Sequence, residues 1–172
     1  MKLTYPGPAS GGSPAFWCDA MLGGLSRWLR ALGYEASFEH GIDDAELVER
    51  AARDQAVLLS SDQPLFNRKR VTSGEVSALF VPRHHPVLDQ AVFVLKTFAL
   101  PVRPLRCMAC GGALLAVTRE EVGTEVPPGA FKCFDEFFRC ERCRKVYWQG
   151  THWTRIEHTR AAIAARLIEP RP

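Results

Sequence analysis

The chain has 172 residues, an apolar fraction of 47% and a formal net charge of +3. This length suits one domain with at most a small added module, and the apolar fraction excludes a disordered chain. The start, MKLTYPGPASGGSP, lacks the apolar core of a secretory signal, and no apolar run is long enough to cross a bilayer. We therefore expect a cytoplasmic protein without a membrane partner.

Residues 1–14 are rich in Gly, Pro and Ser, which predicts a flexible leader. After it, short apolar runs alternate with helical patterns as far as residue 100. Strands are expected at 15–18, 34–38, 56–60 and 78–81. This alternation predicts an α/β domain over 15–100, with a parallel sheet covered by helices on both faces.

Two helices connect the first three strands, and a third follows the last strand. The first covers 21–32, where leucines recur at helical spacing and Arg27 and Arg30 lie off the apolar face. The second begins at Asp43, which is placed to cap it with Glu46 three residues later. Pro86 opens the third.

The pattern changes after residue 100, where two cysteine pairs occur. They are Cys107-Met-Ala-Cys110 and Cys140-Glu-Arg-Cys143. Two CxxC pairs at this separation can surround one tetrahedral zinc ion, and a reducing compartment favours metal binding over disulfides. We therefore expect a structural zinc ribbon over 101–157, followed by a C-terminal helix or tail over 158–172.

Acidic residues follow the predicted strands. Asp19 ends the first strand, Asp62 ends the third, and Asp43 and Asp44 begin the helix after the second. The carboxyl ends of parallel strands meet at one edge, where converging carboxylates repel unless a cation neutralises them. Mg²⁺ or Mn²⁺ suits oxygen ligands and supports phosphodiester hydrolysis. The alternative is that Asp43 and Asp44 only cap the helix.

Basic residues supply candidate RNA contacts on both halves of the chain. In the ribbon they lie near Tyr147, Trp148 and Trp153, which suit single-stranded RNA or the ribbon's own small core. A basic run is otherwise a solvated face. The candidates are Arg27, Arg68, Lys69, Arg70, Arg142 and Arg144.

Several stretches together resemble one known family. They are CDAMLGGLSRWLRALGY over 18–34, DDAELVERA over 43–51 and VLLSSD over 57–62. This set resembles the Mut7-C RNase domain family, a branch of the PIN-like nucleases. Residues 134–140 and 147–153 resemble the zinc ribbon of the same family, so the resemblance covers about residues 15 to 157.

The resemblance implies a three-layer α/β/α fold that cleaves RNA with Mg²⁺ or Mn²⁺. By position, Asp19, Asp44 and Asp62 match the family's metal-binding acids, with Asp43 or Glu46 as a helper. One departure is that no acidic residue follows Asp62 in the stretch QPLFN. Single-stranded or structured RNA is the expected partner, and a homodimer is left open.

These features predict a metal-dependent ribonuclease, and two alternatives stay open. One is a non-catalytic RNA- or ribosome-associated module, in which the zinc ribbon binds and the acidic edge is vestigial. The other is a phosphatase-like domain with Asp19 as nucleophile. That reading needs a DxD-type motif or a positioned lysine, and neither is evident.

Overall fold

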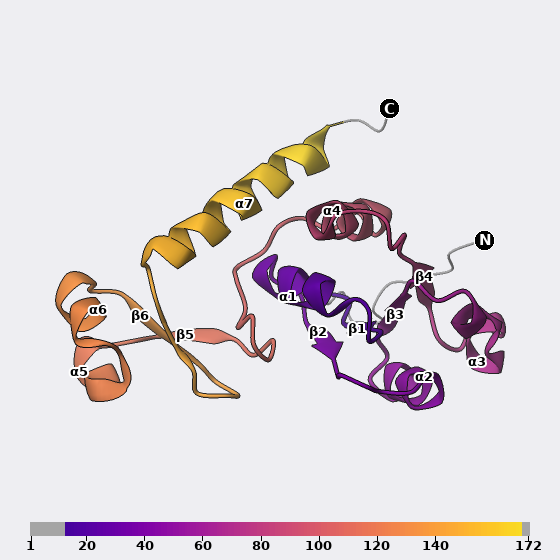
Figure 1. Cartoon of the computed structure of the whole chain (residues 1–172), viewed down its shortest axis with the longest axis horizontal. Coiled ribbons are helices and arrows are strands. Elements are labelled where there is room, and N and C mark those ends of the chain that lie inside the picture. Colours follow the sequence, from indigo (N-terminus) through magenta and orange to yellow (C-terminus); the bar gives the residue numbers. More distant parts are fainter. Residues whose placement is uncertain (1–12, 170–172) are drawn as a thin grey trace.

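The computed structural model describes residues 13–169, which form an α/β domain and a smaller antiparallel unit beside it (Figure 1). Residues 1–12 of the expected leader lie outside the described residues. The strands are β1 (Phe16–Cys18), β2 (Ala36–Phe38), β3 (Val57–Ser60), β4 (Ala78–Phe80), β5 (Leu114–Val117), β6 (Phe137–Cys140) and β7 (Val146–Trp148). The helices are α1 (Gly23–Ala31), α2 (Asp44–Arg53), α3 (Lys69–Thr72), α4 (Val87–Thr97), α5 (Arg119–Val122), α6 (Pro128–Cys133), α7 (Thr151–Ile168) and the 3₁₀ helices η1 (Pro64–Asn67) and η2 (Gly123–Glu125).

The first four strands form one parallel sheet in the order β2-β1-β3-β4. Because successive strand residues point to opposite faces, β1 contributes to two cores. Phe16 and Cys18 pack with α1 and α4, whereas Trp17 packs with α2 and η1. The expected α/β fold with helices on both faces of a parallel sheet is thus confirmed, and each strand is shorter than its sequence pattern by one or two residues.

The second unit is a three-stranded antiparallel sheet in the order β5-β6-β7. Between β5 and β6 the chain forms α5, η2 and α6. Thr118 caps α5, and Glu121 completes a capping box with it. The capping box can be read from the sequence. The segment that it begins contributes Val122 and Val126 to a small core with Phe137.

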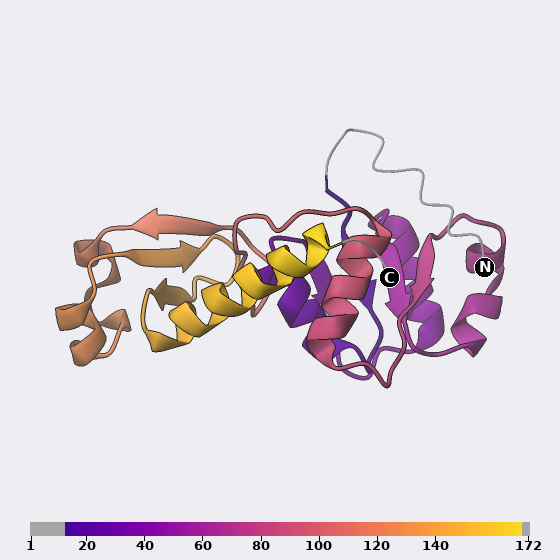
Figure 2. The ribbon, with the colours of Figure 1, turned by 90° about the horizontal axis from the view of Figure 1, so that it is seen from above.

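Helix α7 returns from the ribbon to the α/β domain and lies along α4 (Figures 1 and 2). Ile163 is buried in the core shared with α1 and α4, and Arg166 pairs with Asp89 of α4 at 2.7 Å. The expected boundary between 157 and 158 falls inside this continuous helix. None of the helices within 13–169 combines the length and apolar character needed to cross a membrane.

Arg30 joins the two units through buried hydrogen bonds. Its side chain is 7% exposed, and its Nε donates to the Ala36 carbonyl at 2.6 Å. Its Nη1 donates to the carbonyls of Met108 and Ala109, at 3.2 and 2.8 Å. The sequence placed Arg30 off the apolar face of its helix. It is nevertheless buried, because the ribbon covers that side of α1.

Removing this guanidinium should destabilise the protein strongly. Arg30→Gln cannot reach all three carbonyls and leaves buried acceptors unsatisfied, so we expect the free energy of unfolding to fall by about 3 kcal/mol. Arg27→Gln, one turn earlier and exposed, should change it by no more than about 0.5 kcal/mol. Urea denaturation of both variants measures the difference. Equal stability of the two would contradict this role of Arg30.

Candidate functional site

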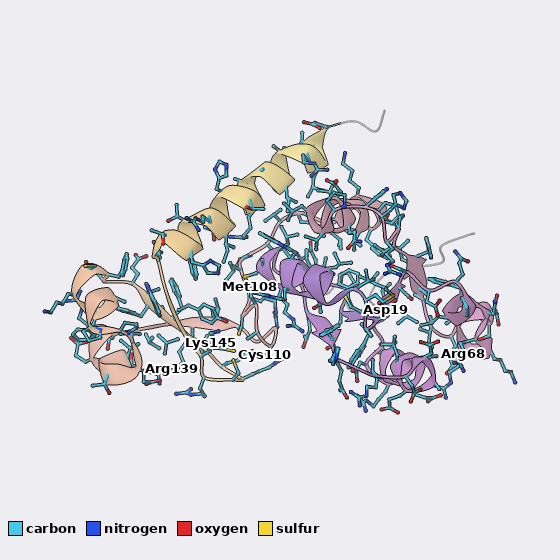
Figure 3. The ribbon with its side chains drawn as sticks, in the orientation of Figure 1. Asp19, Arg68, Met108, Cys110, Arg139 and Lys145 are labelled. Atoms are coloured by element: carbon cyan, nitrogen blue, oxygen red, sulfur yellow. The ribbon has the colours of Figure 1, made fainter. Side chains whose placement is uncertain are left out.

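Asp19 lies at the carboxyl edge of the parallel sheet and is only 5% exposed (Figure 3). Its Oδ1 accepts a hydrogen bond from the Met21 amide at 2.8 Å. Its Oδ2 accepts from the Ser60 hydroxyl and from the Ser61 amide, the latter at 2.9 Å. These donors come from the chain after β1 and from the end of β3, so the carboxylate fastens two neighbouring strands at this edge.

The same network fixes the segment that carries Asp62. The Ser60 hydroxyl donates to Asp19 and accepts from the Asp62 amide at 2.9 Å. The Ser61 hydroxyl donates to the Val81 carbonyl at 2.8 Å, which adds the end of β4. The structure therefore brings Asp19 and the Ser-Ser-Asp segment together, as the positions of β1 and β3 in the sheet require.

Asp43 and Asp44 lie at the start of α2, beyond β2. Asp43 caps this helix, because its Oδ1 accepts from the amides of Ala45 and Glu46 at 2.8 and 3.0 Å. Asp44, in the first turn, lies 3.7 Å from the Arg68 guanidinium. Since β2 neighbours β1, Asp44 shares the carboxyl edge with Asp19 and Asp62, while a capping role accounts for Asp43.

The carboxylates do not form a closed cage. Within residues 13–169, the ligand atoms of the four ribbon cysteines all lie within 4.8 Å of one another. The carboxylates of Asp19, Asp44 and Asp62 do not form such a group. An open arrangement still suits Mg²⁺, which keeps several waters and is commonly held by one or two carboxylates plus a substrate phosphate. The donor set at this edge fits a hard divalent cation on these terms.

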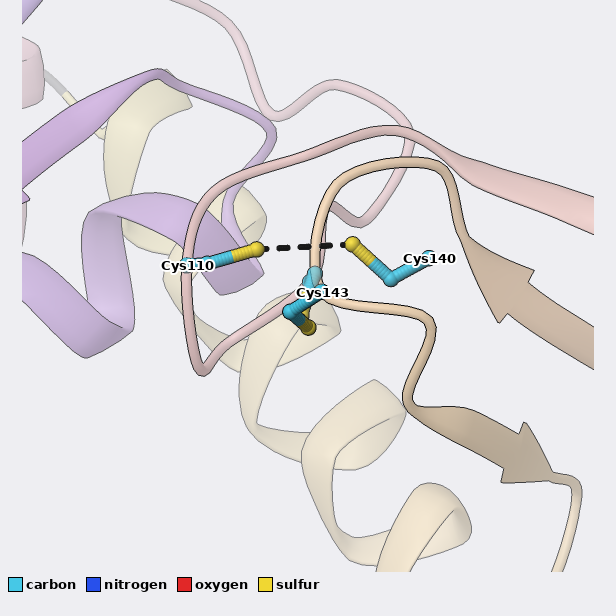
Figure 4. Close-up of side chains that lie close together, drawn as sticks. Cys110, Cys140 and Cys143 are labelled. Atoms are coloured by element: carbon cyan, nitrogen blue, oxygen red, sulfur yellow. Dashed lines mark hydrogen bonds between the residues drawn. The ribbon is translucent and has the colours of Figure 1, made fainter. Parts of the chain in front are cut away.

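The four ribbon cysteines form a compact cluster, and Figure 4 shows three of them, Cys110, Cys140 and Cys143. Their sulfurs all lie within 4.8 Å of one another, with Cys107 and Cys143 at 3.6 Å and Cys110 and Cys140 at 3.4 Å. A tetrahedral site with Zn–S bonds of about 2.3 Å places its sulfurs about 3.8 Å apart. A Cβ at Gly112 would lie 2.8 Å from the Cys140 sulfur, so the turn needs glycine. This cluster can bind zinc.

The surroundings of the cluster shift the pKa values of its sulfurs in opposite directions. Burial opposes ionisation of Cys107, but hydrogen bonds from the Tyr147 hydroxyl and the amides of Cys110 and Ala109 lower its pKa to about 6. Burial raises the pKa of Cys110 to about 12, and the neighbouring Cys140 adds to this rise. A bound dication removes this conflict, because it stabilises all the thiolates together.

Within the described residues, three of the predicted basic contacts form ion pairs with acidic side chains, and three do not. Arg68 pairs with Asp44, Arg70 with Glu49 at 3.0 Å, and Arg142 with Glu35 across the two units. Lys69 and Arg144 are exposed, the first at the start of α3 and the second just after Cys143. Arg27 lines a cavity of about 780 Å³ between α1 and the ribbon.

That cavity also contains residues that the sequence prediction of the site did not select, among them Lys145 and His152. Lys145 and Met108 of the first knuckle, both labelled in Figure 3, line this cavity. No local pattern marks them, because the cavity exists only where the ribbon meets α1. The basic and aromatic residues around the second knuckle were the one signal in the sequence that pointed there.

A parallel α/β domain with an acidic carboxyl edge, joined to a four-cysteine ribbon, defines the class of this protein. The model of the Mut7-C RNAse domain matches residues 14–160, so the chain belongs to this nuclease family, and the resemblance seen in the sequence is confirmed. The human "Exonuclease mut-7 homolog" is 37% identical over 98 residues, which cover 54% of this chain and 11% of that protein. No solved structure matches the chain.

Loss of one cysteine of the cluster should release the metal. We expect Cys140→Ser to lose bound zinc and to unfold the ribbon, because metal binding supplies much of the folding free energy of such units. Cys133→Ser is the matched control, since Cys133 is exposed and lies outside the cluster. Elemental analysis and limited proteolysis measure the outcome. Full zinc content in Cys140→Ser would disprove the site.

The capping role of Asp43 gives a separate test. Asp43→Ala removes the acceptor for two amides and should lower the free energy of unfolding by about 1 kcal/mol. Asp43→Ser keeps a capping oxygen and should stay within about 0.5 kcal/mol of the parent protein. Thermal denaturation followed by circular dichroism compares the two. A serine variant as unstable as the alanine variant would contradict capping.

Proposed function

We propose that this chain is a metal-dependent ribonuclease of the PIN-like type, which hydrolyses RNA phosphodiester bonds at the carboxyl edge of its sheet. The observation that carries the proposal is the buried Asp19 carboxylate, tied to Asp62 through Ser60. Membership of an RNase domain family agrees with it.

The burial of Asp19 needs an explanation of its own. A buried carboxylate is costly unless it is paired or binds a metal. Throughout the described range, the donors to Asp19 are amides and a hydroxyl, and no ion pair joins it to Arg, Lys or His. Asp19 therefore suits a cation that arrives from solution.

Asp19, Asp62 and Asp44 would hold Mg²⁺ or Mn²⁺, with Asp43 supporting Asp44 through the start of α2. Such an ion, when bound, lowers the pKa of a water molecule and offsets charge at phosphorus. Ser60 and Ser61 fix the orientation of the Asp19 carboxylate. Arg68, 3.7 Å from Asp44, is placed to exchange this partner for an RNA phosphate.

The ribbon has a structural part in this proposal. Cys107, Cys110, Cys140 and Cys143 hold zinc as a closed four-sulfur site, which leaves no position for substrate. All six cysteines are free of disulfides, which agrees with a protein of the reducing cytoplasm.

A non-catalytic RNA-binding or ribosome-associated module is the second candidate. It is favoured by the lack of any acidic residue from Gln63 to Asn67 and by the ion pair that occupies Asp44. In that case the acidic edge would bind no metal, and the ribbon and its surroundings would carry the function.

Cleavage of an end-labelled single-stranded RNA separates the candidates. We expect cleavage with Mn²⁺ or Mg²⁺ and none without added divalent cation. Asp19→Asn and Asp62→Asn should each lower the rate by at least about 100-fold, because each removes a carboxylate ligand of the metal ion that stabilises the transition state. Asp135→Asn, an exposed ribbon position, is the matched control and should keep full activity.

Two results would refute the proposed ribonuclease activity. One is the absence of cleavage of varied RNAs by protein with full zinc content. The other is cleavage that survives both Asp19→Asn and Asp62→Asn, since activity would then come from elsewhere in the chain or from a contaminant. Binding of RNA without cleavage would favour the second candidate.

A further inference from the structure

The cavity of about 780 Å³ between α1 and the ribbon has an unusual lining. It contains basic side chains and aromatic rings but no aspartate or glutamate. Its volume lies within the range of about 300–1,000 Å³ common for ligand sites. The residues that matter for its chemistry are Arg27, Lys145, His152, Phe38, Tyr147 and Trp153.

One wall of the cavity is a single face of α1. Gly23, Ser26, Arg27 and Arg30 are spaced three and four residues apart, so they share this face from the first turn to the last. A Cβ at Gly23 would lie 2.7 Å from the Phe38 ring, so this end of the cavity is kept small. Because α1 starts just after Asp19 and Phe38 ends β2, that end lies next to the acidic edge.

Two of the basic side chains in the cavity have no acidic partner among the described residues. In the part of the chain that the structure describes, neither Arg27 nor Lys145 takes part in an ion pair, unlike Arg68, Arg70 and Arg142. With an exposed side chain at each wall, the cavity presents two uncompensated cations, which suits a ligand with negative groups.

The aromatic rings are held in place before any ligand arrives. Trp153 stacks on Phe138 with ring centroids 5.1 Å apart and an angle of 11°. The Tyr147 hydroxyl lies 3.0 Å from the Cys107 sulfur, and Lys145 Nζ lies 5.8 Å from the centre of the Tyr147 ring. Flat rings beside unpaired cations match a nucleotide, which has a flat base and a charged phosphate.

We propose that this cavity binds unpaired nucleotides of a single-stranded RNA next to the acidic edge. Arg27 and Lys145 contact phosphates, and a base stacks against Trp153 or Tyr147. The inference rests on the proposed function, because it assigns RNA as the substrate that reaches Asp19. It adds the site where the strand is held and restricts the substrate class to unpaired RNA.

Binding is measured by fluorescence anisotropy of a fluorescein-labelled 12-nucleotide oligouridylate, with the full zinc-containing chain. All proteins carry Asp62→Asn, so that the probe stays intact whether or not the parent cleaves. We expect Arg27→Ala and Lys145→Ala each to weaken binding by about fivefold and to reduce the slope of log K against log salt by about 0.7. Lys132→Ala, an exposed ribbon lysine outside the cavity, should change neither quantity.

The stacking contact is tested in the same assay. Trp153→Ala should weaken binding by about tenfold, whereas Trp153→Phe keeps an aromatic face and should recover most of the affinity. Zinc content and thermal denaturation establish that each variant is folded. A 12-base-pair RNA duplex should compete poorly, because its bases are not free to stack.

The outcomes distinguish this inference from the proposed function. Weakened binding in the cavity variants supports the site even if the parent protein never cleaves RNA. Unchanged affinity and salt slope in Arg27→Ala, Lys145→Ala and Trp153→Ala would overturn it even if cleavage is metal-dependent. Failure of the parent to bind the oligonucleotide, or equal competition by the duplex, would overturn it as well.

Discussion

The buried guanidinium of Arg30 holds the two units of the protein in one arrangement. It bonds to the carbonyl of Ala36 and to both residues inside the first cysteine knuckle. Burial lowers its pKa, but an arginine stays charged at neutral pH. Four thiolates around Zn²⁺ carry net negative charge, which this cation offsets. Ribbon folding, ribbon docking and the wall of the cavity therefore depend on the same side chain.

At the acidic edge, the buried Asp19 carboxylate accepts hydrogen bonds only from neutral donors within residues 13–169. Asp19 is held by two amides and a hydroxyl, and these fix its direction without neutralising its charge. A salt bridge to Asp19 would instead neutralise the carboxylate and leave no negative charge for an incoming cation. The arrangement suits a site whose positive partner is a cation bound from solution. The cavity beside α1 places cations where the rest of the strand would lie.

Local patterns were enough to predict the alternating strands and helices, the cap at Asp43 and the two CxxC pairs, because each depends on neighbours within a few residues. That the two pairs form one cluster was predicted from the ligand preference of zinc. The buried position of Arg30 was not predictable, since two of its partners are 78 and 79 residues away. The basic run at Arg68–Arg70 read as an RNA contact, yet two of its members pair with acids on α2. Lys145 and Trp153 gain their significance only from the docking of the ribbon, which helical or strand periodicity does not encode.

Anomalous diffraction from crystals of the zinc-containing protein soaked in Mn²⁺ tests the central claim, that the acidic edge binds a divalent cation. We expect a manganese peak within bonding distance of the carboxylates of Asp19 and Asp62, with a zinc peak among the four cysteines as an internal reference. A zinc peak in the ribbon with no manganese at the carboxyl edge of the sheet would contradict the claim and leave the binding module as the better description.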